Sequence, residues 1–248
     1  MSEDILFYVI VGFVAQMVDG AIGMAYGVTS TSVMLSFGVP PATASACVHA
    51  AETFTTGASG LAHWKFGNVD RRLIWRLAIP GSIGGAIGAF VLTNIPGDVV
   101  KPFISGYLLL IGVFIIYKAV HRKHSFIDEP PKNIAPLGFV GGFVDAIGGG
   151  GWGPIVTSTL LGQGTQPRFT IGSVNMAEFF VTLTISATFI ATIGLDLWPT
   201  IVGLIIGGVI AAPFAAYAAK YLPPKILMIL VGTVVILLSA RTIYLAIF

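Results

Sequence analysis

The chain has 248 residues, of which 55% are hydrophobic and only 10% are charged, and its mean hydropathy is +0.90. A soluble domain carries about 25% charged residues, so this sequence cannot cover a globular surface with polar groups. The composition predicts an integral membrane protein, and the formal net charge of +2 gives no indication of nucleic-acid binding. The single cysteine, Cys47, excludes a disulfide within the chain.

The apolar stretches of the first half predict five helices, at about residues 5–18, 23–38, 41–62, 73–94 and 99–120. Helices are expected because backbone groups in lipid must be satisfied within their own segment. The last three stretches approach or exceed the ~20 residues that a membrane-spanning helix needs. The first two are shorter and are joined by Asp19–Gly23, which predicts a re-entrant hairpin of two half-helices.

The second half predicts the same series, at about residues 134–146, 152–163, 167–193, 197–219 and 224–247. Its two short stretches are joined by a turn with four consecutive glycines, Gly148–Gly151. We expect a single membrane domain in which repeat one covers residues 1–120 and repeat two covers residues 134–248. The polar segment 121–133 is predicted to be a cytoplasmic linker between them.

The two halves are copies of one another. A shift of 126 residues aligns Gly12–Ala89 with Gly138–Ala215 without a gap, and 22 of the 78 positions are identical. The identities include polar and glycine positions: Asp19 with Asp145, Gly23 with Gly149, Gly27 with Gly153, Thr31 with Thr157, Ser32 with Ser158 and Glu52 with Glu178. An internal duplication with broken helices in matching places is typical of secondary transporters.

The basic residues predict how the halves are oriented in the membrane. With a hairpin and three spans in each half, 11 of the 13 Lys and Arg residues fall on one side, which the positive-inside rule makes cytoplasmic. If each short pair were one broken span, the split would be 9 to 4. The predicted fold is therefore all-α and membrane-integral. It consists of two inverted repeats, each a re-entrant half-helix hairpin plus three transmembrane helices, with both termini outside.

The Gly-rich turns are expected to form the binding site, because irregular backbone in a membrane is tolerated only in protein or along a cavity. Half-helices that begin near Gly23 and Trp152 would present free N–H groups and a positive dipole end to an anion. Helix packing is the competing interpretation. The expected substrate-binding residues are Gly23, Tyr26, Gly27, Gly149, Gly150, Gly151 and Trp152 in the turns, the hydroxyls of Thr31, Ser32, Thr157 and Ser158, and the matched pair His49 and Asn175.

Four matched acids are the expected proton-coupling residues: Asp19, Glu52, Asp145 and Glu178. Acids within a membrane are costly and are usually functional. An unpaired carboxylate buried in a helix is expected to be neutral, which suits a proton carrier. The alternatives are structural, since the aspartates could cap the following half-helices and the glutamates could make buried hydrogen bonds.

The same acids leave a second function open, which is a cation or metal carrier that uses them together with His49. A protein-bound zinc site needs three or four ligands, and no Cys or His cluster supplies them, so neither a resident metal nor a cofactor is predicted. The chain has no Walker-type phosphate loop, no nucleophile elbow and no HExxH motif. We therefore expect neither ATP hydrolysis nor another enzymatic activity.

The sequence resembles the TauE/SafE family of sulfite and organosulfonate exporters over essentially its whole length. The likeness rests on the Gly-rich turns DGAIGMAYG and DAIGGGGWG, on HWKFGNVDRRL after the third helix and on PGSIGGAIGA in the fourth. The resemblance implies a bacterial or archaeal inner-membrane carrier for sulfite, sulfoacetate or another organosulfonate. We expect alternating access between the repeats, coupled to a proton. The expected partners are a small anion and the lipid bilayer, with no nucleic acid, and a homodimer is left open.

Overall fold

The computed structural model describes residues 4–22, 24–121, 133–163, 165–194, 198–221 and 224–247, which are helical with short connections and contain no strand. The first half contains α1 (Asp4–Ile22), α2 (Tyr26–Ser36), α3 (Pro41–Lys65), α4 (Arg71–Thr93) and α5 (Gly97–His121). The second half contains α6 (Ile134–Gly148), the π-helical turn η1 (Gly153–Thr157), α7 (Ser158–Gly162), α8 (Pro167–Ile193), α9 (Trp198–Tyr221) and α10 (Pro224–Ile247). The predicted helices are confirmed, and the differences lie in the turns.

Two predicted boundaries in the first half are wrong. Helix α1 continues past residue 18 to Ile22, so Asp19 lies inside the helix and not after it. Helix α2 begins at Tyr26 and not near Gly23. The reason is that the Asp19 side chain accepts hydrogen bonds from the N–H groups of Ala25 and Tyr26 at the start of α2. The connection between α1 and α2 can therefore be short. Gly23 itself and residues 122–132 of the predicted linker lie outside the described residues.

Several helices are suited to a membrane. Within the described ranges, four are long and apolar enough to cross one: α4, α5, residues Phe169–Ile193 of α8 and Met228–Leu245 of α10. Large apolar side chains such as Phe90, Phe103 and Leu110 are exposed on their outer faces. An apolar surface of this extent is unsuited to water and is what lipid requires. The chain is therefore embedded in the membrane through several helices.

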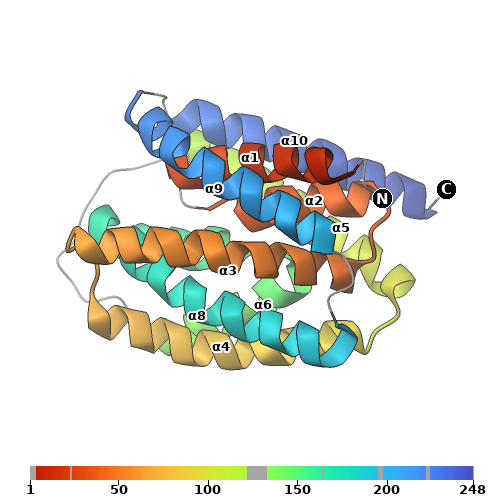
Figure 1. Cartoon of the computed structure of the whole chain (residues 1–248), viewed down its shortest axis with the longest axis horizontal. Coiled ribbons are helices and arrows are strands. Elements are labelled where there is room, and N and C mark those ends of the chain that lie inside the picture. Colours follow the sequence, from red (N-terminus) through yellow and green to blue (C-terminus); the bar gives the residue numbers. More distant parts are fainter. Residues whose placement is uncertain are drawn as a thin grey trace.

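The helices pair across the two halves. Helix α1 packs on α9, and its counterpart α6 packs on α4, while α3 packs on α8 and α5 on α10. Helices α3 and α8 run in opposite directions, because Asn175 meets Ser59 near one end of the contact and Ser186 meets Thr53 further along. The pairing is the same when the two halves are exchanged. Figure 1 shows α3 and α8 side by side in the middle of this arrangement.

The two ends of the molecule differ in charge. In Figure 1 both termini lie at one end, and the C-terminal ends of α3 and α5 lie at the other, together with the N-terminal ends of α4 and α10. Most described basic side chains lie near this second group of helix ends: Lys65, Arg71, Arg72, Arg76, Lys118 and Lys225. Lys101 and Arg241 lie toward the end that carries the termini. The helix directions therefore bring basic residues from both halves to one end.

Glycines allow the closest helix crossings. A Cβ on Gly142 of α6 would lie 2.8 Å from the carbonyl carbon of Gly81 of α4. A Cβ on Gly203 of α9 would lie 2.8 Å from the Tyr8 side chain of α1. Small residues at such crossings let helix backbones approach each other in lipid, where packing drives association. These crossings hold the broken helices of both halves against the fourth helices.

Candidate functional site

A small cavity lies where the broken helices of the two halves meet. The lining comes from the α1–α2 connection, the α6–η1 connection, α3 and α8. The lining residues are Asp19, Met24, Ala25, Tyr26, Gly27, Val28, Glu52, Asp145, Gly150, Gly151, Trp152, Gly153, Pro154 and Glu178. The cavity volume of about 10 Å³ is room for roughly one water molecule. Four of the lining side chains are carboxylates, and the lining includes neither lysine nor arginine.

Both aspartates cap the half-helix that follows them. Asp19 Oδ1 accepts hydrogen bonds from the N–H groups of Ala25 at 2.8 Å and Tyr26 at 3.2 Å. Asp145 Oδ1 accepts from Gly151 at 2.6 Å and Trp152 at 2.9 Å. These are matching positions of the two repeats. The capping role that the sequence left open is therefore present in both halves, and it places a carboxylate at each half-helix N-terminus.

The two half-helices touch at their first turns. A Cβ on Gly27 would lie 2.8 Å from Gly150 Cα and 3.0 Å from the Gly149 carbonyl oxygen. Gly149 has a φ of 65°, the left-handed conformation that favours glycine, and it ends α6. The Thr31 hydroxyl donates to the Gly149 carbonyl across this contact. The expected turn residues Gly27, Gly149 and Gly150 are therefore brought together at the interface between the repeats.

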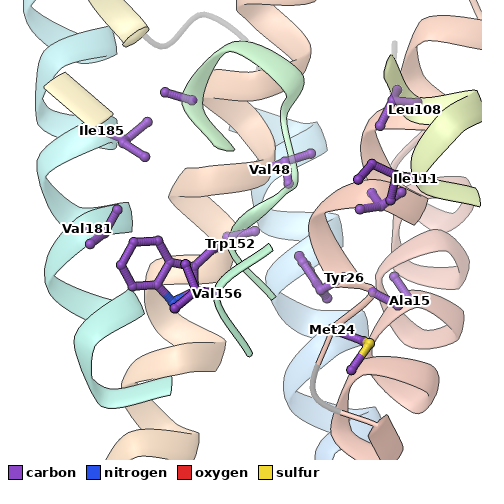
Figure 2. Packing of buried hydrophobic residues seen from close by; sticks show 14 of the residues in the cluster. Ala15, Met24, Tyr26, Val48, Leu108, Ile111, Trp152, Val156, Val181 and Ile185 are labelled. Carbon is purple, nitrogen blue, oxygen red and sulfur yellow. The ribbon is translucent and has the colours of Figure 1, made fainter. Parts of the chain in front are cut away.

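Two aromatic residues wall the cavity from opposite sides. Trp152 is fully buried, and Tyr26, its counterpart in the other repeat, is 1% exposed. Figure 2 shows Trp152 near Val156 and Val181, while Tyr26 lies toward Ala15 and Met24. The Tyr26 hydroxyl donates to the Leu204 carbonyl at 3.2 Å. The Tyr26 ring of the first half is thus held by a carbonyl group of α9 in the second half.

The paired glutamates also reach the cavity. Glu52 is 6% exposed and Glu178 is 8% exposed, and both lie in the middle part of long helices. Within the part of the chain that the structure describes, the Oε2 atom of Glu52 is buried and has no hydrogen-bond partner. The four carboxylates share this one small cavity, so their charges lie close together there.

Other predicted residues lie behind the cavity wall. His49 is fully buried and lies 3.2 Å from Asp145 Oδ2, but it is absent from the lining. Asn175 donates to the Ser59 hydroxyl at 2.9 Å, away from the lining. The hydroxyls Thr31, Ser32, Thr157 and Ser158 are buried in the half-helices and do not line the cavity in this conformation. Their assignment to substrate stays a prediction.

Among the described residues, the side chains of Ser32, Thr157 and Ser158 have no hydrogen-bond partner, and the same is true of Thr29 and Ser30. A buried hydroxyl without a partner is unusual and calls for an explanation. All five lie on the half-helices that meet at the cavity. A five-residue π-helical turn, Gly153–Thr157, opens the second of these half-helices. Turns of this kind are rare and often occur at functional sites.

Two residues of the site were not anticipated from the sequence. Tyr107 of α5 donates its hydroxyl to the Gly150 carbonyl at 3.1 Å and so supports the Gly-rich turn. Ser45, one helical turn before His49, donates to the Ala146 carbonyl at 2.6 Å. The spacing of Ser45 and His49 was a usable signal, because residues four apart share a helix face. No local pattern marks Tyr107, whose contact depends on how α5 packs.

Comparison with known proteins identifies the family of the chain. The sequence profile described as "Sulfite exporter TauE/SafE" matches residues 8–242. The chain belongs to the TauE/SafE family. The resemblance inferred from the Gly-rich turns is therefore confirmed over nearly the whole chain.

Individual relatives point the same way. The chain is 45% identical over 250 residues to a probable membrane transporter protein, YtnM, from Bacillus subtilis (strain 168), covering 97% of this chain and 83% of the relative. It is 25% identical over 175 residues to a probable membrane transporter protein, ORF9, from Sinorhizobium sp., covering 71% of this chain and 62% of the relative. No solved structure matches. Its membership of the TauE/SafE family therefore makes the chain a membrane transporter.

Proposed function

We propose that this TauE/SafE protein is a secondary transporter for a small sulfur-containing oxyanion, such as sulfite, sulfoacetate or another organosulfonate. The family's name and the residues at the cavity support this substrate class. The proposed location is the inner membrane of a bacterium or archaeon, and the bacterial origin of both relatives supports it. A proton is the proposed coupling ion.

The observation that carries the proposal is the pair of capped half-helix N-termini at one cavity. Each N-terminus already holds a carboxylate, which is itself an oxyanion, through two backbone N–H groups. Backbone N–H groups and the positive end of a helix dipole bind sulfonate oxygens by the same interactions. A substrate oxyanion that replaces either aspartate would therefore meet donors in a suitable arrangement.

The proposed transport cycle is alternating access between two inverted repeats. The cavity of about 10 Å³ cannot hold a sulfonate, so a substrate can enter only when helices move apart. Two observations support repeats of opposite orientation. Each helix pair has an equivalent pair when the two halves are exchanged. In addition, α3 and α8 run in opposite directions. The collection of basic helix ends at one end of the molecule supports a cytoplasmic assignment for that end.

Flux measurements with the purified full chain in proteoliposomes test this function. We expect saturable uptake of radiolabelled sulfite that rises when a proton gradient is imposed, with sulfoacetate and sulfate as competitors. Empty liposomes supply the background, and Gly106→Ala serves as a control substitution because a Cβ there meets nothing within 4 Å. Absence of saturable anion movement, with robust cation movement instead, would refute the proposal.

A cation carrier is the second candidate function, and the four carboxylates of the cavity are the observation in its favour. Charged carboxylates attract cations, and only protonation of some of them makes the cavity suitable for an anion. Direct binding experiments separate the two functions. Sulfite binding in isothermal titration, with no heat from magnesium or manganese, supports the anion transporter, and the reverse pattern supports the cation carrier.

A further inference from the structure

A buried histidine–aspartate pair adjoins the cavity, with Asp145 in the lining and His49 behind it. His49 of α3 is fully buried, and Asp145 of α6 is 1% exposed. His49 Nε2 lies 3.2 Å from Asp145 Oδ2. The pair therefore joins the third helix of the first repeat to the Gly-rich turn of the second repeat.

The surroundings of His49 Nδ1 require a hydrogen atom on this nitrogen. Nδ1 lies 2.8 Å from the carbonyl oxygen of Ser45, which can only accept a hydrogen bond. The Ser45 hydroxyl lies 3.2 Å from Nδ1, but it donates its own hydrogen atom to the Ala146 carbonyl at 2.6 Å. Both neighbours of Nδ1 are thus acceptors, and the imidazole ring donates to them.

This arrangement demands one shared proton on the other side of the ring. A neutral imidazole with its hydrogen atom on Nδ1 has only a lone pair on Nε2. That lone pair would face Asp145 Oδ2, which is also an acceptor when the carboxylate is charged. The contact is attractive only when one proton lies between Nε2 and Oδ2, either as imidazolium beside carboxylate or as neutral imidazole beside carboxylic acid.

Several other titratable groups surround the pair. The titratable groups that face Asp145 from the packed elements are Glu52 on α3, Glu178 on α8, Tyr107 on α5, and Asp19 and Tyr26 across the cavity. The ring of Phe189 on α8 packs near His49. Asp145 therefore holds the N–H groups of Gly151 and Trp152 through Oδ1 while it shares the cavity with three further carboxylates.

We propose that the His49–Asp145 pair is the proton-binding site through which a proton gradient drives this transporter. The inference rests on the proposed function, which is proton-coupled secondary transport. When the proton leaves, the Nε2 lone pair and the carboxylate repel each other, and the contact between α3 and the α6–η1 turn opens. Asp145 also caps Gly151 and Trp152, so the same event alters the N–H groups at the cavity.

The other repeat lacks this site. Asp19 caps Ala25 and Tyr26 as Asp145 caps its half-helix, but the position that matches His49 is Asn175. Asn175 donates to Ser59 and does not titrate. The duplication has therefore kept the cap in both halves and the proton pair in one.

Nitrogen NMR of the full chain, with ¹⁵N-labelled histidine in lipid nanodiscs, tests the hydrogen-bond assignment without any substrate. The chain has four histidines, and His49→Asn, which copies the other repeat, identifies the signal of His49. We expect a hydrogen atom on Nδ1, and an Nε2 signal that changes in Asp145→Asn but not in Asp19→Asn. A neutral ring with its hydrogen atom only on Nε2 would overturn the proposal.

Transport in proteoliposomes tests the coupling, with radiolabelled sulfite as the probe. We expect His49→Asn and Asp145→Asn to lower the ratio of gradient-driven uptake to sulfite exchange by about tenfold or more, within the usual range of coupling between two ligands. Asp19→Asn is the matched control, because it removes an equivalent cap without a histidine partner. Whatever its exchange rate, Asp19→Asn should keep the pH dependence of uptake.

The outcomes separate the two proposals. If the His49 and Asp145 variants keep gradient-driven uptake, and Glu52→Gln or Glu178→Gln loses it, the proton site proposed here is wrong and proton-coupled anion transport stands. If the wild-type chain moves no sulfite, the substrate assignment fails, and the NMR titration still decides whether the pair holds a proton.

Discussion

The crossing of α4 and α6 predicts a large effect from one methyl group, introduced as Gly142→Ala. The new Cβ would lie 2.8 Å from the Gly81 carbonyl carbon and 3.0 Å from its Cα, and closer still to its carbonyl oxygen. These are backbone atoms that cannot turn away, so the two helices must separate by roughly 1 Å. Overpacking costs about 1–3 kcal/mol of unfolding free energy. This site is at the upper end of that range, because the close atoms belong to the backbone. The better helix propensity of alanine offsets up to ~1 kcal/mol, so we expect a net loss of about 2 kcal/mol of unfolding free energy.

Thermal unfolding in detergent micelles measures this loss, and about 2 kcal/mol corresponds to a drop of about 4–8 °C for a domain of this size. Asp145 lies three residues beyond Gly142. Because Asp145 caps the half-helix at the cavity, we expect Gly142→Ala to lower the rate of sulfite transport as well. Gly106→Ala is the control, because its Cβ meets nothing within 4 Å. The reasoning is refuted if Gly142→Ala and Gly106→Ala unfold at the same temperature and transport sulfite equally well.

Three further predictions follow from other contacts. Asp70 Oδ1 accepts from the N–H of Arg72 at 2.8 Å and caps α4, so Asp70→Ala should lower the unfolding free energy by about 0.5–2 kcal/mol in chemical denaturation, whereas Asp70→Asn should lose less. Arg241 donates to the Ser36 carbonyl at the end of α2. Loss of this hydrogen bond in Arg241→Gln should lower the unfolding free energy by about 1.5–3 kcal/mol. An equal effect from Lys101→Gln would contradict a specific role for the Arg241–Ser36 hydrogen bond. In a Cys47→Ala background, Phe37→Cys should react with an impermeant maleimide on the side of both termini and Phe66→Cys on the opposite side. Labelling of Phe37→Cys on the side opposite the N-terminus would contradict the hairpin.

The helices were predictable because the membrane makes their signal strong. Long apolar stretches in a lipid-embedded chain have few alternatives to helix, so α4, α5, α8 and α10 were found with nearly their observed bounds. The end of α1 was misplaced because Gly20 and Gly23 look like a break. A cap from inside a helix to N–H groups six and seven residues later depends on the path of the connection, which no spacing rule specifies.

The site was predictable in its parts but not in its connections. Matching across the repeats marked Asp145, Glu178 and the Gly-rich turn, because a duplication preserves what both halves need. It gave no sign that His49 of one repeat would lie beside Asp145 of the other, since that contact depends on the packing of α3 against the α6–η1 turn. The Tyr107 contact was missed for the same reason.

The aspartate caps also determine how tightly any ligand can be held at the half-helix N-termini. Asp19 and Asp145 are tethered a few residues from the N–H groups that they occupy. A group joined by a short tether competes at an effective concentration of about millimolar or higher. An incoming anion must outcompete this internal rival, so its apparent affinity falls while its dissociation becomes faster. Weak binding with rapid release favours a high transport rate over the uptake of a substrate that is present at very low concentration.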